Sequence, residues 1–145
     1  MTTAIRDARP ADADEVARLM RLVGTAILPG DARAREGLED FLAGGGVVLI
    51  AEEGGAVVGA CTLLITRWNP MDETPAAWLD GIVVDEGFRR RGIGSALMRE
   101  ARRRAEEAGC DSILLHTHEE ERPAVALYEH LELSRHGLLL FWDLR

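Results

Sequence analysis

The sequence contains no lysine, so all 17 basic residues are arginine. A Schiff base requires a lysine amine, and a phosphate-binding loop of the Walker A type requires a Gly-Lys pair. Both kinds of site are therefore excluded. Aromatic residues are also scarce, at 5% of the chain.

Cysteine is nearly absent, with Cys61 and Cys110 as its two instances. Two cysteines cannot build a disulfide framework, which indicates a reducing compartment. No apolar run reaches the roughly eighteen residues needed to span a bilayer, and the first residues, MTTAIRDARPAD, lack the apolar core of a signal peptide. These absences predict a cytoplasmic protein without a membrane partner.

The formal net charge of -8 argues against a general nucleic-acid binder and favours cationic partners. The length of 145 residues and a hydrophobic content of 47% predict a single domain over residues 1–145 with a substantial core. A homodimer is compatible with the sequence, but no pattern in it sets the oligomeric state.

The hydrophobic pattern predicts one α/β domain with the element order β-α-α-β-β-β-α-β-α-β. The expected strands are residues 3–8, 47–53, 56–65, 77–85, 111–118 and 138–144. The expected helices start at Asp12, within residues 29–46, at Gly92 and at Pro123. Asp12 and Glu15 have the spacing of a capping box for the first of them.

Residues 89–94, RRRGIG, place positive charge and two glycines at the start of the expected helix from Gly92. The first amides of a helix lack internal partners and lie at the positive end of its dipole, so they donate readily to phosphate oxygens. A dinucleotide fingerprint is ruled out because Leu97 stands where a third small residue is required. The pattern therefore predicts an anion site, and the alternative is a solvated helix entrance with a tight turn.

The stretch IVVDEGFRRRGIGSALMREARRRAEEAG resembles the signature of the GNAT superfamily of acyl-CoA-dependent N-acetyltransferases. That motif is Arg or Gln, two variable residues, Gly, one variable residue, then Gly or Ala, and Arg89, Gly92 and Gly94 meet it. IRDARPADADEVARLM and PAVALYEHLEL are similar to the family's opening and closing segments. The resemblance implies a GNAT-like α/β fold, a mixed β-sheet with splayed central parallel strands flanked by helices.

The resemblance also implies that acetyl-CoA is the acyl donor. The amides from Arg90 to Ser95 would wrap its pyrophosphate, and the strand from Ile82 to Val84 would pair with its pantetheine arm. Gly81, inside that apolar strand, independently indicates a bulge or a close backbone approach. The residues expected to bind the cofactor are Ile82, Val83, Val84, Arg89, Arg90, Arg91, Gly92, Ile93, Gly94 and Ser95.

Acetyl transfer to an amine requires a base, because keeping a lysine-like amine neutral at pH 7 costs roughly 4.6 kcal/mol. Asp80 lies on the strand expected to face the acceptor and is a candidate base; the alternative is an aspartate that faces solvent. The resemblance assigns Tyr128 to the departing thiolate, the alternative being a ring packed on the core. It also assigns a backbone N–H between Ile82 and Val84 to the carbonyl oxygen.

Three further features bear on the site. His116 and His118 share one side of their expected strand, but two histidines without a third well-spaced ligand are a weak metal signal, so no metal is expected. Glu121 stands where the family has an asparagine that contacts the pantetheine arm. Glu132 and Leu133 replace the family's Gly-Phe pair.

The run from Arg102 to Arg104 is interpreted as a solvated helix face. Helical spacing predicts three ion pairs on it: Glu100–Arg104, Arg102–Glu106 and Arg103–Glu107.

Together these features predict an N-acetyltransferase that passes an acetyl group from acetyl-CoA to a primary amine of a small molecule or peptide, by direct attack in a ternary complex. The alternative is a non-catalytic domain that binds acyl-CoA as a sensor or structural module. The loops 66–76 and 24–35 are expected to shape the acceptor pocket. Asp72, Glu73 and Asp80 favour a cationic acceptor, whose identity is not readable.

Overall fold

The structure, a computed structural model, describes residues 2–22, 31–66, 74–137, 140 and 142–144. Its contacts divide the chain into two compact units, residues 1–115 and residues 116–145, and each unit is described by itself. The expectation of a single domain over residues 1–145 stays a prediction. No helix in the described ranges is long and apolar enough to cross a membrane.

The first unit is built on a five-stranded sheet with the order β1-β2-β3-β4-β5. Neighbouring strands from β1 to β4 are antiparallel, whereas β4 and β5 are parallel. The strands are β1 (Ala4–Asp7), β2 (Gly46–Glu53), β3 (Ala56–Thr66), β4 (Ala76–Val84) and β5 (Ile113–Leu115). This mixed sheet confirms the predicted fold class.

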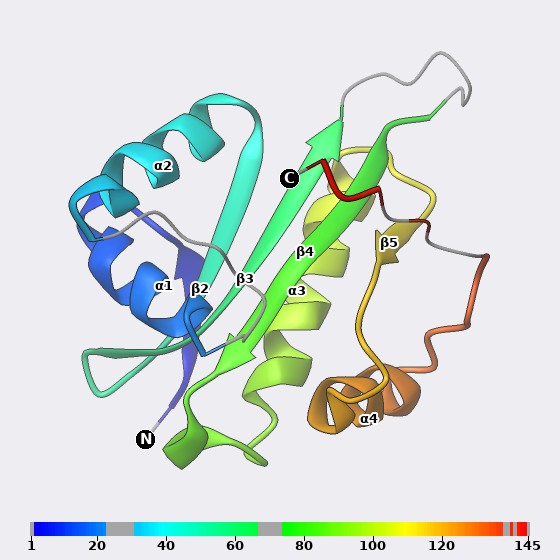
Figure 1. Cartoon of the computed structure of the whole chain (residues 1–145). Coiled ribbons are helices and arrows are strands. Elements are labelled where there is room, and N and C mark those ends of the chain that lie inside the picture. Colours follow the sequence, from blue (N-terminus) through cyan, green and yellow to red (C-terminus); the bar gives the residue numbers. More distant parts are fainter. Residues whose placement is uncertain (1, 23–30, 67–73, 138–139, 141, 145) are drawn as a thin grey trace. The chain divides into compact units, whose positions relative to one another are not determined.

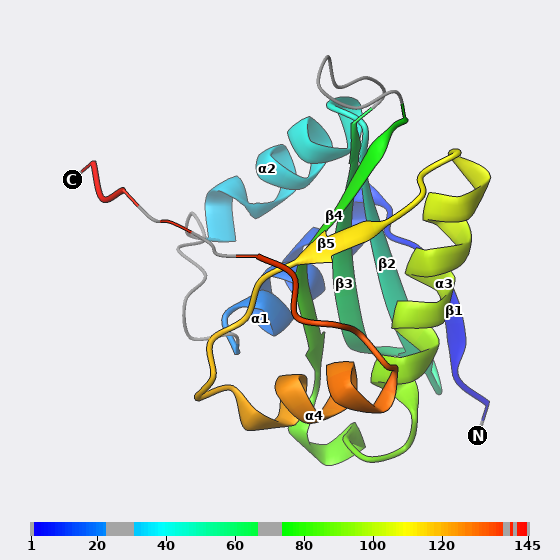
Figure 2. The same ribbon diagram turned by 90° about the vertical axis from the view of Figure 1, so that its right-hand side faces the viewer.

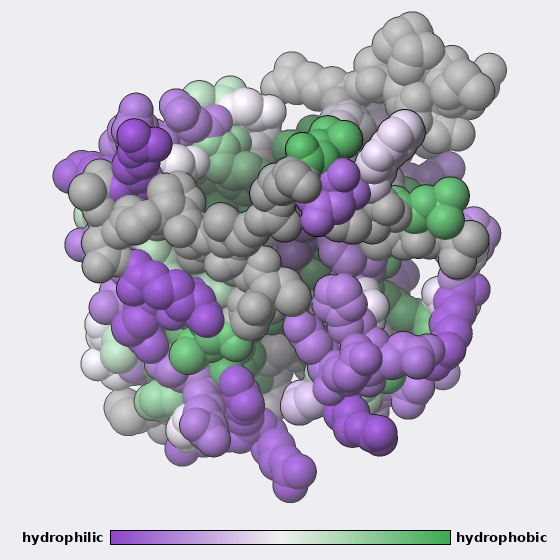
Figure 3. Space-filling view, viewed as in Figure 1, coloured by the Kyte–Doolittle hydropathy of each residue, from purple (hydrophilic) through white to green (hydrophobic). Residues whose placement is uncertain are grey.

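Helices cover both faces of the sheet. Figure 1 and Figure 2 show α1 (Ala13–Met20) and α2 (Asp31–Ala43) on one face and α3 (Ile93–Glu107) on the other. Because both faces are covered, β2 and β3 are nearly continuous apolar runs rather than alternating ones. The outer surface over α1 and α2, on the left in Figure 3, carries hydrophilic side chains with small hydrophobic areas between them.

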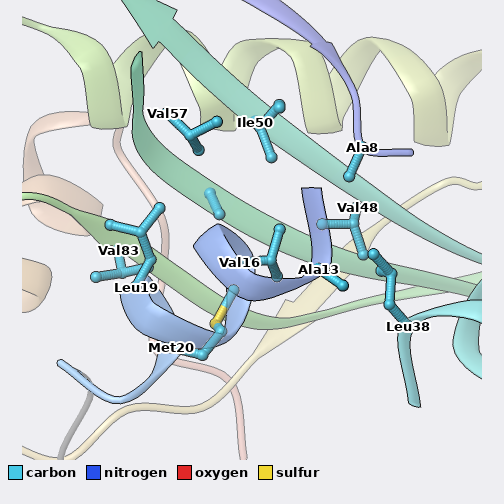
Figure 4. Packing of buried hydrophobic residues seen from close by; sticks show 11 residues of the cluster. Ala8, Ala13, Val16, Leu19, Met20, Leu38, Val48, Ile50, Val57 and Val83 are labelled. Atoms are coloured by element: carbon cyan, nitrogen blue, oxygen red, sulfur yellow. The ribbon is translucent and has the colours of Figure 1, made fainter. Parts of the chain in front are cut away.

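The amphipathic helix α1 turns its apolar side to the sheet. Val16, Leu19 and Met20 are buried and belong to one cluster with Ile50 and Val83 of the strands (Figure 4). Leu19 is 0% exposed, and full burial of a leucine contributes about 2 kcal/mol. This packing holds α1 over β3 and β4.

The opposite face of the sheet is covered by α3 through buried apolar residues, among them Ile93 and Leu97. Gly59 of β3 allows this helix to approach closely, since a Cβ there would lie 3.3 Å from Ile93 Cγ2 and from Leu97 Cδ1. Gly59 pairs with Val84, the last residue of β4. The first turn of α3 is therefore held beside the end of β4.

The expected capping box of Asp12 and Glu15 is not formed. The Asp12 carboxylate accepts a hydrogen bond from the Arg9 amide at 2.7 Å and two from the Arg6 guanidinium at 2.8 and 3.0 Å. Glu15 pairs instead with Arg18 at 2.9 Å. The hydrogen bonds from Arg6 lower the pKa of Asp12, and they tie this carboxylate to the strand β1 instead of to the first amides of α1.

Two expected strands also differ. The strand expected over residues 111–118 is limited to β5, because pairing with β4 ends at Leu115. The strand expected over residues 138–144 is not seen at its described residues 140 and 142–144, and its other residues lie outside the described ranges. Leu140, Trp142 and Leu144 are 82–87% exposed.

The second unit contains α4 (Arg122–His130), which begins with Pro123 in its first turn. Proline suits this place because the amide it lacks has no intrahelical acceptor there. The helix confirms the one expected from Pro123.

Candidate active site

The register of β4 changes where the sequence indicated a bulge. Thr62 of β3 pairs with Gly81. The next residue of β3, Leu63, pairs with Leu79. Asp80 is therefore the extra residue on β4, and the bulge expected at Gly81 is present beside it. Bulges re-aim side chains, and Asp80 is exposed.

One edge of β4 is open beyond this bulge. Pairing with β5 ends at Leu79 and Leu115, whereas β4 continues to Val84. From Asp80 to Val84 this edge has no neighbouring strand within the described ranges. An unpaired edge offers backbone donors and acceptors to an extended ligand. The splay that the resemblance implies between the central parallel strands stays a prediction, because β5 ends at Leu115.

The loop from β4 to α3 has left-handed backbone conformations at Arg90 (φ 63°) and Gly92 (φ 78°). A Cβ on Gly92 would meet no atom within 4 Å, so backbone conformation rather than space requires glycine there. For Arg90 the same conformation costs roughly 1–2 kcal/mol. Strain of this kind is characteristic of binding loops and must be offset by surrounding contacts.

The amides of residues 90–95, called the amide cradle below, follow this loop into α3. The helix begins at Ile93, and the Ala96 amide donates to the Gly92 carbonyl at 2.9 Å. The cradle amides donate to no acceptor in the part of the chain that the structure describes. Unpartnered amides at the N-terminus of a 15-residue helix are suited to donate to an anion such as a diphosphate, as the sequence predicts.

The three arginine side chains beside the amide cradle have different surroundings. Arg89 Nε donates to the Val84 carbonyl at 3.0 Å. Arg91 Nη1 lies 3.0 Å from the carboxylate of Glu53. Arg90 is exposed, and its guanidinium has no hydrogen bond or ion pair with any described residue. Arg90 is therefore the member of the run whose guanidinium has no partner among the described residues.

The two candidate catalytic residues lie in different units. Asp80 is on β4 of the first unit, and Tyr128 is half-buried on α4 of the second. Their meeting in one site, which the sequence predicts, remains untested.

No metal cluster is formed by the described residues: none of their histidine, cysteine, aspartate and glutamate side chains gather in groups of three or more that could hold an ion. His116 and His118 are both exposed.

The two cysteines are poor nucleophiles. Burial raises the pKa of the Cys61 thiol to about 12. Desolvation also raises the pKa of the Cys110 thiol. Because the thiolate is the reactive form, these shifts lower the reactivity of both side chains.

The acceptor side of the site is only partly described. Asp72 and Glu73, expected to border the acceptor, lie outside the described residues. Trp78 on β4 is 42% exposed, and sequence reasoning missed it. The sequence signal for Trp78 was an aromatic residue two positions before Asp80, the candidate base.

Glu53, which pairs with Arg91, was also not among the residues predicted for the site. The sequence signal for it was a charged residue at the end of an apolar strand.

The sequence and the structure were compared with known proteins. A search of curated protein sequences found no match. A putative acetyltransferase from Agrobacterium tumefaciens has a TM-score of 0.85 at 25% identity, covering 97% of this chain and 99% of its own. An aminoglycoside N-acetyltransferase in complex with CoA has a TM-score of 0.83 at 23% identity, covering 99% of this chain and 95% of its own.

A ribosomal-protein-alanine N-acetyltransferase from Brucella melitensis biovar Abortus has a TM-score of 0.80 at 23% identity, covering 100% of this chain and 99% of its own. The model of the acetyltransferase (GNAT) family matches residues 18–132 of the sequence. That match spans most of the chain, which therefore belongs to the GNAT family of acetyltransferases.

Proposed function

We propose that the chain transfers an acetyl group from acetyl-CoA to a primary amine of a small molecule or peptide, by direct attack within a ternary complex. The observation that carries this proposal is the amide cradle, whose unpartnered amides lie at the N-terminus of α3 and follow the open edge of β4 along the chain. A donor with a diphosphate and an extended amide-containing arm suits these two features.

Electrostatics favours acetyl-CoA at the amide cradle. The N-terminal end of α3 carries a partial positive charge, and Arg90 adds a full charge that no described carboxylate neutralises. The cradle amides would bind the diphosphate oxygens, and the backbone from Ile82 to Val84 would pair with the pantetheine arm.

For the chemical step, the amine nitrogen bonds to the thioester carbon while the carbon–sulfur bond breaks. Asp80 accepts the proton that the amine loses, directly or through water. A backbone amide between Ile82 and Val84 donates to the carbonyl oxygen as its negative charge develops. Tyr128 donates to the departing sulfur. The raised pKa of Cys61 argues against an acyl-enzyme on that cysteine, because the thiolate is its attacking form.

A cationic amine is the proposed acceptor. Two of the solved structures similar to this chain are an aminoglycoside N-acetyltransferase and a ribosomal-protein-alanine N-acetyltransferase. In this chain Trp78 and Asp80 are both exposed on β4, where a ring face and a carboxylate would attract a cation. The net charge of -8 adds long-range steering, which salt screens over about 8 Å.

Release of free thiol from acetyl-CoA, measured with a panel of amines at two ionic strengths, tests this proposal. Polyamine-like, aminoglycoside-like or basic peptide amines should react faster than neutral or anionic ones, and their advantage should shrink as salt rises. Binding of CoA without thiol release for any amine would contradict the transfer reaction. A preference for an anionic amino acid, unaffected by salt, would contradict the cationic acceptor alone.

Two glycines at opposite ends of α3 provide a matched test of the amide cradle. Gly92 and Gly109 both have left-handed backbones, with φ of 78° and 82°, and a Cβ on either would meet no atom within 4 Å. Alanine should therefore cost each site about 1 kcal/mol of stability. Only Gly92→Ala should lose most of the rise in melting temperature that CoA produces. Equal CoA responses in the two variants would remove the cradle from the proposal.

A further inference from the structure

Glu53, the last residue of β2, is the one buried polar or charged residue within the described ranges, at 8% exposed. Its Oε1 accepts a hydrogen bond from Arg91 Nη1 at 3.0 Å, and its Oε2 accepts one from Thr3 Oγ1 at 3.0 Å. Both carboxylate oxygens are thus partnered. A buried carboxylate is costly unless it is satisfied in this way, so these partners are strongly held.

The partner of Glu53 lies at the centre of the strained loop. Arg91 stands between the two left-handed residues, Arg90 and Gly92. Its guanidinium carbon also lies 5.1 Å from the centroid of the Phe88 ring. Arg91 is therefore fixed on two sides, by a ring from its own loop and by a carboxylate that is 38 residues away in the sequence.

A fixed Arg91 side chain would restrict the direction of the cradle amides. Arg90 and Gly92 are left-handed, and Arg91 lies between them. Few other backbone conformations of these three residues would keep the chain connected to both β4 and α3. Without the tie to Glu53, Arg90 can leave its costly conformation, and the amides after it then turn away from a common anion.

We propose that Glu53 is a positioning residue, which acts through Arg91 to hold the amide cradle in the orientation that binds the diphosphate of CoA. The proposal rests on the proposed function of the amide cradle. For removal of the Glu53 charge, the proposal predicts a change in CoA affinity opposite in sign to the one that simple electrostatics predicts. Removing a negative charge near an anion site should strengthen anion binding by Coulomb's law, whereas loss of positioning should weaken it.

Glu53→Gln tests this difference, because glutamine keeps the size and one acceptor while removing the charge. The dissociation constant for CoA, measured by calorimetry, should rise about tenfold, as expected for loss of one charge-assisted hydrogen bond. The KM for acetyl-CoA should rise with it, while kcat at saturating acetyl-CoA is retained. Glu52→Gln is the matched control: Glu52 is the adjacent residue and pairs with Arg6 at 2.9 Å, so CoA binding should be unchanged.

Arg91→Gln removes the guanidinium partner of Glu53 at a side chain that is 53% exposed, and its melting temperature shows whether the protein still folds with the Glu53 carboxylate left behind. It should weaken CoA binding to the same degree, and the double variant should be no weaker than either single one. Weaker binding in Arg91→Gln with tighter or unchanged binding in folded Glu53→Gln would mean that Arg91 contacts the ligand itself, and would overturn the proposal. Failure of the unmodified protein to bind CoA would instead contradict the proposed function.

Discussion

The chain contains two runs of three arginines, and the structure uses them in different ways. Residues 102–104 lie on the regular helix α3, where each side chain reaches a glutamate one turn away. All three pairs predicted from helical spacing are present: Glu100–Arg104, Arg102–Glu106 and Arg103–Glu107. Residues 89–91 lie in an irregular loop. There Arg89 donates to a carbonyl, Arg90 is exposed, and Arg91 pairs with a buried carboxylate.

Under the proposed function, backbone conformation rather than the number of positive charges distinguishes the anion site at residues 89–95 from the solvated face at residues 102–104. On α3 the helix itself uses the amides, and glutamates neutralise the guanidinium groups. At the loop the amides of residues 90–95 are unpartnered among described residues, and the charge of Arg90 is not neutralised. An anion site needs both unpartnered amides and a positive charge that is not neutralised, and of the two runs only residues 89–91 have them.

The largest expected effect concerns the chemical step, to which neither run contributes. Tyr128→Phe keeps the ring and removes the hydroxyl that would donate to the departing sulfur. We expect kcat in the thiol-release assay to fall about a hundredfold, as is typical for loss of a general acid. The KM for acetyl-CoA and the CoA-induced rise in melting temperature should be retained. Full activity of the variant would leave Tyr128 with a packing role only.

A smaller effect compares one arginine from each run. Arg90→Gln and Arg102→Gln each remove one exposed positive charge. The first should raise the KM for acetyl-CoA about tenfold, because a charge-assisted contact to phosphate is lost, and the second should leave it unchanged. The effect of Arg90→Gln should diminish as salt rises. Equal changes in both variants would show that net charge alone acts, and the contrast between the runs would fail.

Features set by neighbouring residues were predictable from the sequence. The start of α3 and its ion pairs depend on residues within one or two helical turns. The bulge beside Gly81 depends on a single position in a strand. The parallel pairing of β4 with β5 agrees with the central parallel strands that the family resemblance implied.

Contacts between distant residues were not predictable in this way. Glu53 and Arg91 are separated by 38 residues, and Arg104 and Asp7 by 97. No local rule selects such partners from among the chain's 25 acidic residues. A distant contact can also override a local rule: the bidentate hydrogen bonds from Arg6 on β1 outweigh the single capping bond expected of the Asp12 carboxylate.

The smallest expected effect tests the second run as a stabilising element with no part in binding. Glu100 accepts hydrogen bonds from Arg103 and Arg104, and these lower its pKa to about 2, below the ordinary value of 4.5. A lowered pKa in the folded state means that the carboxylate contributes stability above about pH 4.5 and loses it as the pH falls towards 2.

Glu100→Gln should therefore lower the free energy of unfolding by about 1 kcal/mol at pH 7, and the difference from the unmodified protein should vanish as the pH falls from 4.5 towards 2. Denaturant unfolding at several pH values measures this difference. Glu106→Gln is the control, because its pair with Arg102 is exposed on both sides and should change stability little at any pH. The KM for acetyl-CoA should be unchanged in both variants. A rise in KM for Glu100→Gln would mean that the outer face of α3 is coupled to the amide cradle, and the two arginine runs would then not be separate in function.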